Sequence, residues 1–286
     1  MTMNITVGTV QKVVQVSDTR VTKLYRNGKK EIADDLAIKP VLLVHPNVRC
    51  FMTYCGLAIM GERTTSELMS ELLVSTEETS GLYLYLNSFK KRFSEIFYEE
   101  VRRNHIDRPL WRTSIQFAGF EYPTGVEHPG TLFYGTITNH ETKDGELLEI
   151  PNESFELRGK VINTPDYRAK MRGAYIVVDG INTINGRRIL NTKIRTFQRS
   201  KLFHRTSSLF IASELASIIR DYSNSKESEG LVGATCVGGM LTNDGEIGVY
   251  SFDNNGRFIP ISPIVVTNNK IIKNAYQNTD GTIKMM

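Results

Sequence analysis

Alternating apolar and polar positions indicate β-strands near the start of the chain. Residues 5–10 and 12–18 are rich in Val and Thr, which favour extended backbone, and they predict two neighbouring strands. Residues 40–44 and 49–54 predict two more strands, separated by a short turn. The polar residues between the two pairs contain an Asn-Gly turn signal, so we expect an exposed hairpin or loop over residues 23–35.

Apolar residues then recur every three or four positions, which is typical of amphipathic helices. Leucines between residues 62 and 73 would form one face of a first helix. A second helix is predicted over residues 82–101 and a third over residues 207–222. Residues 167–178 are also amphipathic and predict a helix, although nearby glycines weaken that interpretation.

The strand pattern resumes after the helical regions. Residues 113–120 predict one strand. Asp-Gly turns predict two hairpins, the first from residues 131–138 and 147–150, the second from residues 232–241 and 247–252.

The order of these blocks favours an α+β fold. Strands, two helices, strands, a helix and strands follow one another, which indicates antiparallel sheets with segregated helices rather than regular βαβ winding. Two sheets stacked face to face, with helices outside, would bury the apolar faces of both. We expect one domain over residues 1–286, with its core at about 2–252 and a polar C-terminal extension at about 253–286.

Composition argues against several classes of protein. The 286 residues are 40% hydrophobic with a net charge of +4, and no apolar run approaches the ~18 residues of a membrane helix. The first residues lack a signal peptide, and three cysteines argue against a disulfide framework, so we expect a cytoplasmic protein. Basic residues between 187 and 205 fit a solvated face or subunit contact better than a nucleic-acid site.

The sequence predicts no metal or cofactor. The five histidines have no ligand spacing, and most fall in polar stretches. Gly238-Gly239 lies between two predicted strands, whereas a phosphate-binding loop leads into a helix.

The candidate chemistry lies at the N-terminus. The small residue Thr2 permits an aminopeptidase to remove Met1, so we expect activation to need no further processing. The result would be a threonine with a free α-amine, which combines a nucleophile and a base in one residue. Asp18 follows 16 positions later, and Lys39 opens an apolar strand.

Four segments, in this order, resemble proteasome-type N-terminal-nucleophile hydrolases, including proteasome β subunits and Anbu-type bacterial peptidases. They are VVQVSDTRVT, KPVLLV with the later YCGLA, SIQFAGFE, and LVGATCVGGMLTNDG. The resemblance runs from Thr2 to about Phe252. It implies a four-layer αββα sandwich, a peptide or polypeptide substrate, no cofactor, and self-association into a ring or spiral homo-oligomer.

The same resemblance implies a role for each matching residue. The Thr2 hydroxyl would attack the scissile carbonyl, and the α-amine would accept its proton through water. The ammonium of Lys39 would favour the deprotonated forms of both Thr2 groups, and Asp18 would hold Lys39 in place. The backbone N–H of Gly56 would donate to the oxyanion.

The chain also departs from the family pattern. It lacks the Gly-Ser-Gly-Ser and Asp-x-x-Ser-Gly-Gly segments that support the amine, and Ser228 or Glu229 is the candidate substitute. The Asp18–Lys39 spacing is several residues longer, within the 23–35 segment. Two alternatives therefore stay open: a catalytically inactive subunit with a role in assembly or gating, and an amidase with a small non-peptide substrate.

Overall fold

The computed structural model describes most of the chain. The described residues are 2–24, 30–45, 47–60, 62–76, 81–122, 130–142, 144, 146–162, 175–179, 207–267, 270–272, 276–277 and 283–284. Several features of the sequence lie outside them: Met1, the Asn27-Gly28 turn, His128, His204 and the basic residues between 187 and 205.

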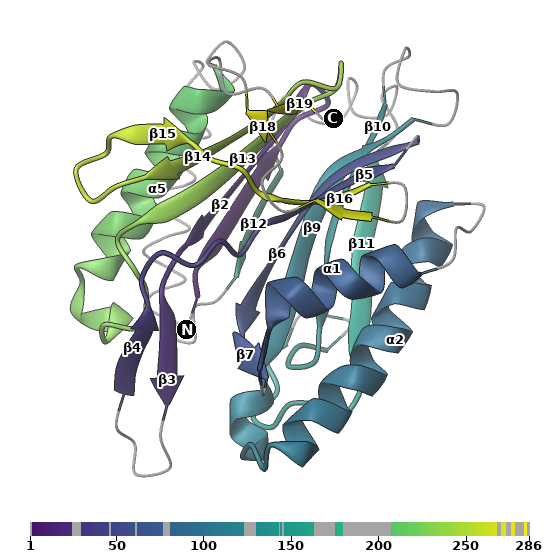
Figure 1. Cartoon of the computed structure of the whole chain (residues 1–286), viewed down its shortest axis with the longest axis vertical. Coiled ribbons are helices and arrows are strands. Elements are labelled where there is room, and N and C mark those ends of the chain that lie inside the picture. Colours follow the sequence, from purple (N-terminus) through teal and green to yellow (C-terminus); the bar gives the residue numbers. More distant parts are fainter. Residues whose placement is uncertain are drawn as a thin grey trace.

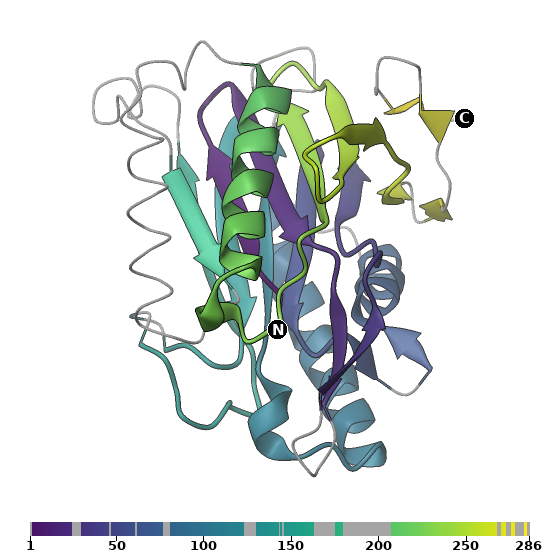
Figure 2. The same ribbon diagram turned by 90° about the vertical axis from the view of Figure 1, so that its left-hand side faces the viewer.

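Two main sheets lie face to face, with helices on their outer sides (Figures 1 and 2). The first sheet has the order β12 (Tyr175–Asp179), β1 (Asn4–Gly8), β2 (Lys12–Asp18), β13 (Cys236–Thr242), β14 (Ile247–Phe252), β15 (Phe258–Pro260). The second has the order β11 (Glu156–Ile162), β10 (Thr131–Thr138), β9 (Thr113–Glu121), β6 (Val48–Gly56), β5 (Val41–His45), β16 (Ile264–Thr267), β17 (Lys270–Ile272).

Three α-helices belong to the described part of the chain. They are α1 (Thr65–Ser75), α2 (Leu82–Arg103) and α5 (Ser208–Ser223). Short pieces complete it: 3-10 helices η1 (Arg108–Trp111) and η2 (Lys226–Ser228), and the pairs β3 (Val21–Leu24) with β4 (Lys30–Asp34), β7 (Ile59–Met60) with β8 (Arg63–Thr64), and β18 (Tyr276–Gln277) with β19 (Ile283–Lys284). The predicted α+β class is confirmed, and the hairpin expected over residues 23–35 is β3–β4.

Local sequence explains where the helices begin. Helix α1 starts at a capping box, in which Thr64 and Glu67 satisfy each other's backbone N–H groups. Helix α5 starts at Ser207, whose side chain accepts a hydrogen bond from the N–H of Phe210. The three helices expected from the apolar spacing over 62–73, 82–101 and 207–222 are all present.

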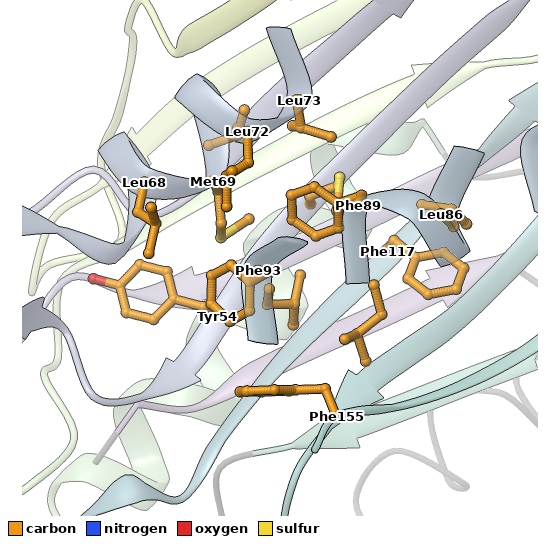
Figure 3. Close-up of a cluster of buried hydrophobic side chains, with 14 of the residues drawn as sticks. Tyr54, Leu68, Met69, Leu72, Leu73, Leu86, Phe89, Phe93, Phe117 and Phe155 are labelled. Carbon is orange, nitrogen blue, oxygen red and sulfur yellow. The ribbon is translucent and has the colours of Figure 1, made fainter. Parts of the chain in front are cut away.

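Three apolar clusters fill the spaces between the layers. In the first, α1 and α2 pack on the second sheet, and the rings of Phe93 and Phe155 meet edge to face at 5.1 Å (Figure 3). In the second, Leu215 of α5 packs on the first sheet. In the third, Phe51 and Leu241 fill the space between the sheets. The apolar faces of both sheets are therefore buried, as the strand pattern requires.

The structure corrects two predicted elements. Residues 147–150 form no strand, and Leu147 makes only an isolated bridge to Glu141. The partner of β10 is instead β11, which follows the buried ring of Phe155; Ile150 is exposed and has no apolar face to pair. Within the helix predicted over 167–178, residues 175–178 belong to strand β12, which pairs with β1, and the rest lie outside the described residues.

The C-terminal strands extend both sheets beyond the expected end of the core at residue 252. Strand β15 adds an edge to the first sheet. The sequence led us to expect purely antiparallel sheets. Strand β16 pairs with β5 in parallel, so the second sheet is mixed instead. Val265 and Val266 are buried, and this apolar pair is the reason that the segment joins the core despite its polar surroundings.

Candidate active site

The side chain of Lys39 is fully buried just before β5. Its Nζ donates to Thr2 Oγ1 at 2.8 Å, to the carbonyl oxygen of Arg20 at 2.7 Å and to Asp18 Oδ1 at 3.4 Å. Three N–H groups thus meet three acceptors, which is the full capacity of an ammonium. Burial lowers the pKa of Lys39, and the carboxylate of Asp18 opposes that shift.

Asp18 ends β2 and is the electrostatic partner of Lys39. Its Oδ1 accepts from the N–H of Met3 at 2.7 Å as well as from Lys39, and its Oδ2 accepts from the N–H groups of Arg20 and Gly233, each at 3.0 Å. All four acceptor positions of an ionised carboxylate are therefore used. This set of backbone donors fixes the carboxylate independently of Lys39.

The pairing of β1 with β2 brings Thr2 to this position. The N–H of Asp18 donates to the carbonyl oxygen of Met3, which continues the register of the two strands. Met3 and Ile5 pack against α5, so the alternation of an extended chain turns Thr2 the other way, toward the second sheet. Thr2 is only 2% exposed, and its hydroxyl faces Lys39.

A second ion pair supports the residues around this cluster. The guanidinium of Arg20 contacts both carboxylate oxygens of Asp35, at 2.8 and 3.0 Å, and donates to the carbonyl oxygen of Gly230 at 3.0 Å. Arg20 therefore ties the segment before Lys39 to the segment before β13. Arg20, Asp35 and Gly233 were not predicted as parts of the site. Arg20 lies two positions after Asp18 in the segment VVQVSDTRVT, and this proximity was its only signal in the sequence.

Gly56 lies at the exposed end of β6, opposite Thr113 in the neighbouring strand. Its φ is +108°, and a Cβ at this position would lie 2.0 Å from the carbonyl oxygen of Arg112. Glycine is required there for both reasons. None of the described hydrogen bonds joins Gly56 to Thr2, Asp18 or Lys39.

The two candidates for supporting the amine have other positions. Ser228 is buried, but its Oγ lies 2.7 Å from the carbonyl oxygen of Ser223 and accepts from the N–H of Gly230, so it closes its own turn. Glu229 is exposed and has a left-handed backbone, with a φ of +49°. The connection between α5 and β13 instead reaches the site through the backbone of Gly233.

Comparisons with known proteins give similarity in structure alone. No family model and no curated protein matches the chain. The Gly-1 mutant of Anbu from Hyphomicrobium sp. strain MC1 aligns over 86% of this chain and 84% of its own, at 12% identity and a TM-score of 0.50. The chain has an Anbu-like fold. The resemblance seen in the sequence is therefore confirmed for the fold.

Two further Anbu structures align with lower TM-scores. The Anbu (ancestral beta-subunit) from Yersinia bercovieri covers 87% of this chain and 81% of its own, at 13% identity and a TM-score of 0.46. The helical assembly of the Anbu complex from Pseudomonas aeruginosa covers 84% and 80%, at 12% identity and a TM-score of 0.45.

Other chemistry around the site of this Anbu-like chain is limited. Cys236 is paired with Asp18 in the register of β13 and β2, and burial raises the pKa of its thiol. A neutral buried thiol is a poor nucleophile. Within the described ranges, no three His, Cys, Asp or Glu residues gather as a metal-binding group, and no helix has the length and apolar character to cross a membrane.

Proposed function

We propose that this chain is a threonine-type N-terminal-nucleophile hydrolase of the proteasome-like αββα type, which cleaves peptide or amide bonds with Thr2. One observation carries the proposal: Lys39 Nζ lies 2.8 Å from Thr2 Oγ1, and both residues are buried beside Asp18. Lysine is almost never fully buried without a paired charge. A fold that only needed stability would gain more from an apolar side chain at this position.

The charges around Thr2 suit a nucleophile. A buried ammonium beside the hydroxyl stabilises a developing alkoxide, and it also lowers the pKa of a neighbouring amine by repulsion. An α-amine has an ordinary pKa of about 7.7–8.0, so a modest fall leaves it neutral and basic near neutral pH. Asp18 keeps Lys39 aimed at the hydroxyl while its own charge is satisfied by backbone donors.

The reaction follows from these positions. Cleavage of the Met1–Thr2 bond exposes the α-amine. Thr2 Oγ1 then attacks the substrate carbonyl carbon, and its proton passes through water to the amine. The C–N bond of the substrate breaks, the leaving amine takes that proton, and an ester on Thr2 remains. Water attacks the ester, the carboxylic acid leaves, and Oγ1 regains a proton.

Gly56 is our proposed donor to the oxyanion, because its backbone lies at an exposed strand end where a substrate can approach. One such donor is worth roughly 3 kcal/mol in the transition state. We assign no step to Glu229, whose side chain is exposed. Self-association into a ring or spiral, a peptide substrate and a cytoplasmic location stay predictions, and mass photometry of the purified protein measures the first.

A specific observation favours the competing proposal, a non-catalytic subunit. The hydroxyl of Ser228 forms hydrogen bonds within its own turn and none with Thr2 among the described contacts. The side-chain support that the family gives to the amine is therefore not supplied by Ser228. Both proposals predict the same fold and both allow oligomers. Chemical reactivity of Thr2 separates them.

The test is the intact mass of the protein with and without a peptide epoxyketone, which reacts with both the hydroxyl and the amine of an N-terminal threonine. We expect loss of Met1 and one adduct per chain. Thr2→Ala should give no adduct, whereas Thr53→Val, which alters another buried threonine, should react like the wild type. Retained Met1, or a free Thr2 amine without an adduct, would establish the non-catalytic subunit.

A further inference from the structure

The layer between the two sheets is polar at the end nearest Thr2. Five buried side chains form this part, which we call the polar seam: Asn4, Thr6, Gln15, Thr53 and Gln116. Thr6 Oγ1 donates to Gln116 Oε1 at 2.9 Å, and Gln15 Nε2 donates to Thr6 Oγ1 at 3.0 Å. Another part of the layer is apolar and contains Phe51, Phe120 and Leu241. The seam therefore links the two sheets by hydrogen bonds in addition to these hydrophobic contacts.

Several atoms of the polar seam have no hydrogen-bond partner among the described residues. They include one atom each of Gln15, Thr53 and Gln116, and both amide atoms of Asn4. Native proteins leave few such groups and commonly satisfy them with ordered water. Asn4 stands apart within the seam because both polar atoms of its carboxamide lack a partner among the described residues. Its side chain is also completely buried.

Asn4 is also the seam residue closest in the chain to the nucleophile. Asn4 and Thr2 lie on the same side of an extended segment, since Met3 and Ile5 between and after them face α5. Residues two apart on a strand are separated by about 7 Å. A direct hydrogen bond of about 2.9 Å cannot span that distance. The side chain of Asn4 can instead reach toward the α-amine of Thr2 and bind it through one water.

We infer that Asn4 positions the α-amine of Thr2, through a water that accepts from the amine and donates to Asn4 Oδ1. The inference rests on the proposed function, because only a cleaved Met1–Thr2 bond supplies the amine. It assigns to Asn4 the support that Ser228 and Glu229 do not give. Asn4 is a positioning residue, since it acts on Thr2 and does not contact substrate.

The sign of the effect distinguishes this role from a structural one. An acceptor near the amine stabilises the ammonium form and so raises the pKa of the amine. Asn4→Leu removes the acceptor at similar volume, so the pKa of the amine falls. Asn4→Asp replaces it with a negative charge, so the pKa rises. A purely structural role predicts no such opposite movement.

The experiment measures the rate of epoxyketone adduct formation against pH by intact mass. We expect the midpoint to move down by about one pH unit in Asn4→Leu, and the plateau rate to fall about tenfold, the equivalent of one hydrogen bond to a charged group. The midpoint should move up in Asn4→Asp. Thr53→Val, which removes another unpartnered seam atom on the opposite sheet, should leave both quantities unchanged.

The outcomes separate the two proposals. Suppose that the wild type forms the adduct but the midpoints of both Asn4 variants stay unmoved or move the same way. That result would refute the role of Asn4 and leave the nucleophile intact. A wild type that never reacts would remove both. If Asn4→Leu does not fold, Asn4→Asp alone decides by the direction of its midpoint. A crystal structure of the mature protein should also show a water bonded to the Thr2 amine and to Asn4.

Discussion

Asp18→Asn and Lys39→Met remove the same buried ion pair, but we expect them to destabilise the protein by different amounts. When Lys39 is replaced, Asp18 keeps three backbone N–H donors, from Met3, Arg20 and Gly233, at 2.7 to 3.0 Å. When Asp18 is replaced by Asn, Lys39 keeps only neutral acceptors, the oxygens of Thr2, Arg20 and the new amide. The carboxylate is solvated by the backbone, whereas the ammonium depends on its partner.

The magnitudes follow from what each variant leaves behind. Leaving one charge of a buried pair without its partner costs about 3–5 kcal/mol. The amide N–H groups introduced by Asp18→Asn also face backbone N–H donors that a carboxylate oxygen accepted from. Lys39→Met loses three hydrogen bonds but leaves the carboxylate satisfied, at about 0.5–1.5 kcal/mol for each bond. Asp18→Asn should therefore be less stable than Lys39→Met by roughly 1 kcal/mol.

Urea unfolding at neutral pH measures both free energies of unfolding, provided that the m-values agree. The exposed pair of Arg102 and Glu153, 2.8 Å apart, supplies a matched control, and Glu153→Gln should cost less than about 1 kcal/mol. Equal costs for Asp18→Asn and Lys39→Met, or a larger cost for Lys39→Met, would show that the backbone donors do not sustain the carboxylate.

Two further predictions concern pH and a glycine. Because burial lowers the pKa of Lys39 below 10.5, the unfolded chain binds more protons between the lowered value and 10.5. The stability of the wild type relative to Lys39→Met should rise with pH in that window; a constant difference would contradict it. Gly56→Ala, with its Cβ 2.0 Å from a carbonyl oxygen, should cost about 3 kcal/mol or more, against about 1 kcal/mol for Gly230→Ala, whose Cβ meets open space. Thermal and urea unfolding measure both costs, and equal costs for the two glycine variants would contradict the prediction.

Much of the architecture could be predicted from the sequence because local patterns carry it. The helices have regular apolar spacing, and the strands of residues 12–18 and 113–120 have strong β-formers. The hairpin predicted at residues 147–150 was wrong because a turn signal says nothing about which later segment offers the better apolar partner. Strand β11 offers it, next to Phe155. Non-local pairing decided the outcome.

Some residues of the candidate site could also be predicted from the sequence, and others could not. Thr2, Asp18 and Lys39 could be singled out by residue type and order, and the structure places them together. The part played by Gly233 was beyond the sequence, because its backbone N–H meets Asp18 across 215 positions. Asn4 gave no signal either. A buried amide without a partner is a property of the packed sheets, and no motif records it.

The parallel pairing of β16 with β5 sets the order of events during biosynthesis. The strand that follows Lys39 gains this neighbour only when residue 267 has been made, and β2, which ends at Asp18, gains β13 only after residue 242. A ribosome adding ~5–20 residues per second needs roughly 10–50 s to pass from Asp18 to that point. The nascent chain therefore carries its threonine for most of synthesis without an assembled charge cluster around it. The cluster of Thr2, Asp18 and Lys39 is therefore completed late, although its residues emerge first.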